Sequence, residues 1–193
     1  MTTTQPTLTA TLWPATTETR AKLLRGAVLA LIGTALIALS ARIQVPMWPV
    51  PMTMQTFAVL VIGMAYGARL GAATLVLYLA EGAVGLPVFA SGGGIAYFAG
   101  PTTGYLLGFL IAAVLVGWLA ERGFDRSVSR AALAMALGTV AIFLPGVAWL
   151  SAFLGSVEAG LANGLVPFIP GAVLKLALAA AALPLAWKFL ARR

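Results

Sequence analysis

Long apolar stretches, separated by short polar or Gly- and Pro-rich segments, constrain this chain more than any other feature. A transmembrane helix needs roughly 20 predominantly apolar residues, and shorter helices occur where neighbouring helices shelter them. Six stretches meet this description: 22–42, 53–67, 69–86, 101–120, 130–154 and 167–190. Because the chain is 61% hydrophobic and only 9% charged, it has too few charged residues to cover a water-exposed surface. The sequence therefore predicts an all-α, polytopic membrane protein, with six transmembrane helices in a single domain at 22–190 and a polar N-terminal tail at 1–21.

The distribution of Lys and Arg predicts the orientation of these helices. Loops rich in Lys and Arg are retained in the cytoplasm. With six spans, one side of the membrane receives most of the 12 positive residues: Arg20, Lys22, Arg25, Arg69, Arg122, Arg126, Arg130, Lys188, Arg192 and Arg193. Only Arg42 and Lys175 fall on the other side. Both termini are therefore expected in the cytoplasm.

Several kinds of chemistry are disfavoured by what the chain lacks. It contains no Cys and no His, the usual transition-metal ligands, and His is also the commonest general base near neutral pH. Carboxylates are limited to Glu18, Glu81, Glu121, Asp125 and Glu158. The net charge of +7 is scattered between apolar runs rather than gathered on one basic face. We therefore expect no metal site, no catalytic residues, no cofactor and no nucleic-acid partner; the expected surrounding is membrane lipid.

Three connections on the predicted outer side are apolar although helices cannot continue smoothly through them. They lie at 44–52, 86–101 and 155–171 and are rich in Pro or Gly. Apolar loops of this kind are expected to fold back over the helices, with their backbone groups buried or lining a cavity. Together they predict a lid over a pocket, and simple connectors are the alternative.

Two ionisable residues within apolar stretches are candidates for ligand binding. Lys175 follows Pro170-Gly171, a favourable helix start, so a carboxylate there would meet both the ammonium and free backbone N–H groups. Alternatively, the long Lys175 side chain reaches the membrane surface without a ligand. Glu81 interrupts an apolar run and is expected to face the bundle interior. There it would accept hydrogen bonds from a ligand or pair with Lys175 or Arg42.

Uncharged polar and aromatic residues complete the predicted substrate site. Gln55 and Asn163 are expected to read an amide or ureido group. Aromatic side chains are expected to form the apolar walls, although most aromatic residues in a helical bundle serve packing. The candidates are Tyr78, Phe89, Tyr97, Phe98, Tyr105 and Phe168.

A strip of small residues runs along the first predicted helix. Gly26, Ala30, Thr34 and Ala38 recur every four residues and so lie on one face. Small residues at this spacing let a second helix approach closely. That second helix belongs either to this chain or to a partner.

Four short motifs follow one another along the chain. They are Val-Pro-Met-Thr-Met-Gln-Thr at 50–56, Gly-Leu-Pro-Val-Phe-Ala at 85–90, Gly-Pro-Thr-Thr-Gly-Tyr-Leu-Leu-Gly-Phe at 100–109, and Pro-Phe-Ile-Pro-Gly at 167–171 followed by Lys175. In this order and spacing they resemble the BioY family, the biotin-specific substrate-binding subunits of energy-coupling factor (ECF) transporters. The resemblance covers about residues 22–190.

The resemblance implies a six-helix protein of the prokaryotic plasma membrane that takes up biotin, bound near the outer face under the loop joining the first two helices. It also implies that the small-residue strip contacts a transmembrane coupling subunit, itself bound to two cytoplasmic ATPase subunits. This chain has no nucleotide-binding loop of its own. Some family members lack dedicated ATPases or form oligomers, so a homo-oligomer remains open.

Two departures from the family pattern affect the polar contacts. The family usually has Asp three residues before the Lys of the last motif, where this chain has Ala172, and it often has Arg in the Gly-rich loop, where 91–99 is uncharged. An Asp one turn away would neutralise Lys175. Without it, Lys175 pairs with another acid such as Glu81 or is free for the biotin carboxylate.

The resulting hypothesis pairs Lys175 with the carboxylate and uses Gln55, Glu81 or Asn163 for the ureido ring. Alternatives are uptake of another vitamin or small carboxylate, a multi-pass membrane enzyme, and a structural membrane subunit with no ligand.

Overall fold

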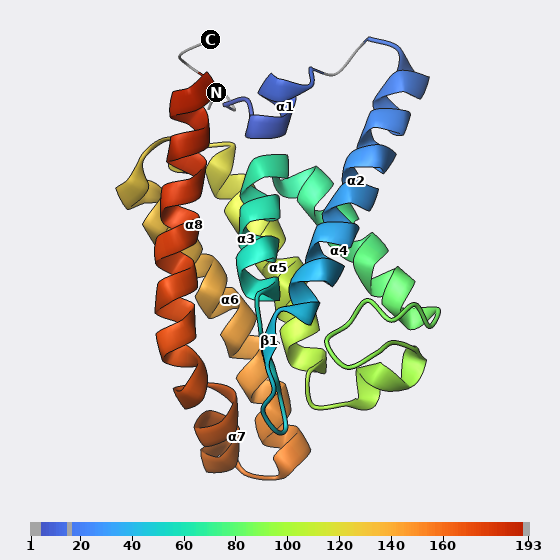
Figure 1. Cartoon of the computed structure of the whole chain (residues 1–193), viewed down its shortest axis with the longest axis vertical. Coiled ribbons are helices and arrows are strands. Elements are labelled where there is room, and N and C mark those ends of the chain that lie inside the picture. Colours follow the sequence, from blue (N-terminus) through green and yellow to red (C-terminus); the bar gives the residue numbers. More distant parts are fainter. Residues whose placement is uncertain (1–4, 15–16, 191–193) are drawn as a thin grey trace.

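The computed structural model describes residues 5–14 and 17–190 and is built almost entirely from helices (Figure 1). The helices are α1 Leu8–Leu12, α2 Thr19–Arg42, α3 Gln55–Tyr66, α4 Ala68–Ala83, α5 Thr103–Ala120, α6 Val128–Leu154, α7 Val157–Gly164 and α8 Ile169–Leu190. Short 3-10 turns lie at η1 Ile95–Ala99, η2 Phe124–Arg126 and η3 Val166–Phe168, and two strands, β1 Gln44–Val45 and β2 Met52–Thr53, form a small antiparallel hairpin.

Each of the six stretches predicted from the sequence overlaps one of the longer helices: α2, α3, α4, α5, α6 and α8. Four described segments are long and apolar enough to cross a membrane: Thr19–Arg42, Thr103–Ala120, Val128–Leu154 and Val157–Leu190, the last comprising α7, η3 and α8. The α3 helix is apolar but shorter. The chain is therefore an all-α membrane protein, as expected, apart from the two-residue strands, which the sequence did not predict.

The centre of the bundle is α5, which packs against α3, α4 and α6. Glycines make the α5–α6 contact close: a Cβ added at Gly108 would lie 2.6 Å from the Ile142 carbonyl oxygen. By contrast, large side chains of α2 such as Leu23 and Leu39 are exposed. Apolar side chains on the outer surface and small residues at the helix contacts are the arrangement expected in lipid.

The centre of the small-residue strip on α2 is packed inside the chain. Ala30 and Thr34 are 6% and 3% exposed, and the Thr34 hydroxyl donates to Glu81 of α4, Oγ1 to Oε1, at 3.1 Å. Gly26 and Ala38 are half-buried, and a Cβ at Gly26 would meet no atom within 4 Å. The sequence left open whether this strip contacts a helix of this chain or of a partner. In the structure, the chain's own α4 packs against the centre of the strip.

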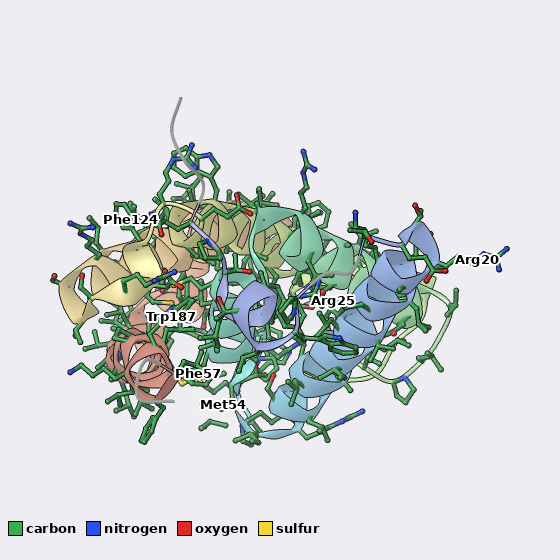
Figure 2. The ribbon with its side chains drawn as sticks, turned by 90° about the horizontal axis from the view of Figure 1, so that it is seen from above. Arg20, Arg25, Met54, Phe57, Phe124 and Trp187 are labelled. Atoms are coloured by element: carbon green, nitrogen blue, oxygen red, sulfur yellow. The ribbon has the colours of Figure 1, made fainter. Side chains whose placement is uncertain are left out.

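One end of the bundle carries α1 and the C-terminal end of α8 (Figure 1). Thr9 Oγ1 donates to the Ala65 carbonyl at the end of α3, and Arg25 Nη2 donates to the Thr9 carbonyl, both at 2.9 Å. Figure 2, which looks onto this end, shows α1 lying across it and Arg20 pointing away from the bundle. The tail predicted at 1–21 therefore contains a short helix fastened to the domain, a difference from the sequence-based expectation; α2 also begins inside it, at Thr19.

The same end collects most of the positive charge. It receives the start of α2, the start of α4, the loop between α5 and α6, and the end of α8, with the residues Arg20, Lys22, Arg25, Arg69, Arg122, Arg126, Arg130 and Lys188. Arg192 and Arg193, assigned to this side from the sequence, lie outside the described residues.

The opposite end is covered by the three apolar connections. The β1–β2 hairpin, the segment between α4 and α5, and α7 with η3 lie there (Figure 1). Each buries an apolar side chain against the bundle: Val50, Phe89 and Phe168 are 4%, 0% and 7% exposed. All three connections thus fold back over the helices.

Candidate ligand-binding site

A cavity lies between the helices and the three folded-back connections. About 730 Å³ of space free of protein atoms lies among its lining residues, part of it continuous with solvent. The lining comes from the hairpin, α3, η1, α5, α6, η3 and α8, and comprises Val50, Pro51, Thr53, Gln55, Thr56, Leu60, Ala90, Tyr97, Thr102, Tyr105, Leu106, Phe109, Thr139, Phe143, Phe168, Ala172, Lys175 and Leu176.

Lys175 is the one charged side chain among the described residues that line this cavity. It is half-buried, and its ammonium donates to the Thr53 carbonyl and, at 3.3 Å, to Thr56 Oγ1. Within the described ranges the only ion pair closer than 4 Å joins Arg126 and Asp125, so no carboxylate of the described chain neutralises Lys175. A cation that lies in an apolar helix and contacts only neutral acceptors favours the arrival of an anion.

Gln55, the first residue of α3, lines the cavity and is fixed by two neighbours. Its Oε1 accepts from Thr53 Oγ1 at 3.1 Å, and its Nε2 donates to the Tyr78 hydroxyl at 2.6 Å. Tyr78 in turn donates to the Val88 carbonyl at 2.9 Å. Tyr78 is fully buried and is not part of the cavity lining, so it reaches the site through Gln55.

Aromatic rings form one wall. Tyr105 stacks on Phe168 at 6.3 Å between ring centroids, and Phe143 meets both rings edge-on at 6.0 and 5.9 Å. The Tyr105 hydroxyl donates to the Gly164 carbonyl of α7 at 2.7 Å. Gly164 has to lack a side chain here, because a Cβ would lie 2.5 Å from that hydroxyl oxygen. The hydrogen bond of Tyr105 thus joins this wall of α5 to α7.

Phe89 anchors the segment between α4 and α5 instead of lining the cavity. Its ring lies against Gly82 of α4, where a Cβ would overlap three of its ring carbons. The rings of Tyr78, Tyr97 and Phe98 surround it at centroid distances of 5.4, 4.7 and 5.6 Å. Of these three rings, Tyr97 faces the cavity. Phe89 thus holds Tyr97 in place.

Two more residues proposed from the sequence, both of them polar, also lie away from the cavity. Glu81 accepts from Thr34 at the α2–α4 contact, and no ion pair joins it to Lys175 or Arg42 among the described residues. Asn163 donates from Nδ2 to the Ala159 carbonyl within α7, at 2.8 Å. Neither residue lines the cavity, because Glu81 points toward α2 and Asn163 is bound to its own helix.

Other lining residues were not singled out from the sequence. Thr56 and Thr102 lie within the motifs at 50–56 and 100–109, so these two polar residues could have been selected as site candidates from the sequence. Thr139 and Phe143 lie in the middle of the long apolar α6, where a single Thr or Phe is indistinguishable from ordinary packing.

The chemistry of the cavity fits a small organic anion. It combines one cation, one amide, several hydroxyl groups and aromatic walls, the mixture found in sites that orient a mostly apolar ligand. The described residues contain no cluster of three side chains able to hold a metal ion. Fold and cavity together define a helical membrane protein with a site for a small solute under its folded-back connections.

Comparison with known proteins identifies the family. A profile of the BioY family matches residues 9–192, and the chain belongs to this family. A probable biotin transporter BioY from Pyrococcus horikoshii is 39% identical over 146 residues, which cover 75% of this chain and 85% of the relative. The biotin transporter BioY of Thermotoga maritima is 37% identical over 150 residues, covering 77% of this chain and 88% of the relative.

A solved structure has the same fold. It is the S-component for biotin from an ECF-type ABC transporter, and it superposes with a TM-score of 0.76 at 25% sequence identity. The superposition covers 89% of this chain and 95% of that protein.

Proposed function

We propose that this chain binds biotin and mediates its uptake as the substrate-binding component of an ECF-type transporter. The observation that carries the proposal is the aromatic-walled cavity that contains Lys175 and Gln55, in which Lys175 pairs with no carboxylate of the described residues. Membership of the BioY family and the names of its relatives support biotin as the solute. The proposed role is binding and release without chemical turnover.

The cavity suggests how biotin is held. The valerate carboxylate would pair with Lys175 and with the hydroxyl of Thr56, which already accepts from the ammonium. Gln55 would meet the ureido ring, and the wall of Tyr105 and Phe168 would cover the thiophane. Glu81 and Asn163 have no part in this arrangement, because they do not line the cavity.

We also propose six transmembrane helices, with both termini in the cytoplasm of a prokaryotic cell and the cavity facing outward. The positive end that carries α1 would be cytoplasmic by the distribution of Lys and Arg. The α3 and α4 helices have 12 and 16 residues, about 18 and 24 Å at the usual helical rise, and are shorter than a bilayer core. Both pack against the central α5, which suits short spans sheltered by neighbours.

Transport would require partners. A transmembrane coupling subunit with two ATPase subunits is the proposed arrangement, and the name of the solved S-component supports a complex of this kind. Because the centre of the α2 strip is packed on α4, the partner would meet the exposed side of α2, which carries Leu31, Leu36 and Leu39.

The test of the solute is equilibrium binding of labelled biotin to the purified protein, with unlabelled small carboxylates as competitors. Saturable binding displaced by biotin, with biotin recovered unchanged, supports the proposal. Displacement by a different carboxylate at lower concentration would assign the site to that solute, and chemical conversion of bound biotin would instead favour a membrane enzyme.

A further inference from the structure

The hydrogen bonds behind Gln55 form a chain whose direction is determined by its last member. The Val88 carbonyl can only accept, so the Tyr78 hydroxyl must use its single proton there, at 2.9 Å. Tyr78 therefore has only acceptor capacity left for Gln55, 2.6 Å away. The Gln55 amide must turn its NH₂ group toward Tyr78 and its oxygen toward the donating hydroxyl of Thr53.

This direction decides what Gln55 offers to a ligand. One N–H of Nε2 is used on Tyr78, and Nε2 makes no other hydrogen bond within the described part of the chain. Gln55 lines the cavity, and its second N–H is the side-chain donor left for a bound solute. A solute acceptor such as a carbonyl oxygen is favoured at this point, and a donor is disfavoured.

We propose that Tyr78 is a positioning residue that sets ligand specificity by holding the Gln55 amide in this orientation. The inference rests on the proposed biotin function, because it takes the ureido carbonyl as the acceptor that Gln55 reads. Tyr78 is 0% exposed and Gln55 4% exposed, so water has little access to replace the missing partner if the Tyr78 hydroxyl is removed.

The position of Tyr78 also explains why this role does not require contact with the ligand. Its hydroxyl links the start of α3 to Val88, next to Phe89, whose ring lies 5.4 Å from the Tyr78 ring. The Gln55 amide is thus fixed on the side away from the cavity by Tyr78 of α4 and, through Tyr78, by the segment between α4 and α5.

The test compares biotin with iminobiotin, whose guanidine group presents N–H donors where the ureido group has a carbonyl oxygen. In Tyr78→Phe the amide can rotate and present its oxygen. We expect biotin affinity to fall about 3- to 10-fold, the effect of one hydrogen bond, and iminobiotin affinity to stay level or rise. The preference for biotin over iminobiotin therefore narrows.

Tyr66→Phe is the matched control, since the Tyr66 hydroxyl also donates to a carbonyl, that of Leu29 at 2.9 Å, but away from the cavity. This variant should leave the preference unchanged. In a Gln55→Met background, Tyr78→Phe should produce no further change in the preference, because Tyr78 acts only through Gln55.

An unchanged preference in folded Tyr78→Phe would overturn the proposal while leaving biotin binding intact. If Tyr78→Phe does not fold, Gln55→Glu tests whether the ligand needs an N–H donor at residue 55. A carboxylate cannot donate to Tyr78 and offers the ligand only acceptors. A biotin preference retained by Gln55→Glu would overturn the proposal equally. Failure of the unmodified protein to bind biotin would overturn both this inference and the proposed function.

Discussion

Replacing Gly82 by Ala should loosen the segment that closes the cavity. The three atoms nearest to an added Cβ all belong to the Phe89 ring. The ring has no room to retreat, because it is fully buried and has Tyr78, Tyr97 and Phe98 on its other sides. Phe89 must therefore leave its position, or α4 and the closing segment must move apart.

The magnitude follows from two opposing effects. Overpacking a buried contact costs about 1–3 kcal/mol, and losing an aromatic pair costs about 0.5–1.5 kcal/mol more. Ala gains at most about 1 kcal/mol over Gly in the interior of a helix. We expect Gly82→Ala to lower the free energy of unfolding by about 1–3 kcal/mol overall.

Thermal unfolding in one detergent measures this effect, and Gly26→Ala on α2 is the control. A Cβ at Gly26 meets no atom within 4 Å, so that variant should be as stable as the unmodified protein or slightly more stable. Adding Phe89→Leu to Gly82→Ala should cause less than the sum of the two losses, because a smaller side chain relieves the overlap. Equal unfolding temperatures for Gly82→Ala and Gly26→Ala would refute the reasoning.

Two further variants test other contacts. Burial raises the pKa of the Asp125 carboxyl, which accepts from Trp187 Nε1 at 2.6 Å. The free energy of unfolding therefore falls as pH rises through this raised pKa, because the folded protein must then hold a buried charge. Asp125→Asn keeps an acceptor and should unfold at a higher temperature than the unmodified protein at about pH 8, with the difference shrinking toward about pH 4; a constant difference would contradict this. Tyr105→Phe leaves the buried Gly164 carbonyl without its donor and should lower the free energy of unfolding by about 1–2 kcal/mol, whereas an unchanged unfolding temperature would show that the bond is dispensable.

The helices could be predicted from the sequence because bilayer thickness sets their length and apolar character. The same rule gave no signal for α7, whose eight residues include Gly160, Asn163 and Gly164. Its helix is started by Ser156, whose side chain accepts from the Ala159 N–H, and is held by Tyr105 from a distant part of the chain. Tertiary contacts of this kind are not visible in local sequence.

The site was predictable only in part, for a similar reason. A charge within an apolar stretch needs a polar neighbour, but the rule does not say which neighbour. Lys175 lines the cavity, whereas Glu81 accepts a hydrogen bond from Thr34 of α2. Tyr78 was predicted to form part of the aromatic wall of the site, yet it lies outside the cavity lining and its hydroxyl accepts from the Gln55 amide.

The central claim is that Lys175 provides the charge that holds the ligand's carboxylate, and one comparison of affinities tests it directly. Biotin and biotin amide are titrated against the unmodified protein, Lys175→Met and, as a control on the same helix outside the cavity, Lys188→Met. A charge-assisted hydrogen bond contributes about 1.5–3 kcal/mol, so Lys175→Met should weaken biotin about 10- to 150-fold but should change the affinity for the amide little. Lys188→Met should change neither affinity. Equal losses for biotin and the amide in Lys175→Met, or no loss for either, would contradict the account.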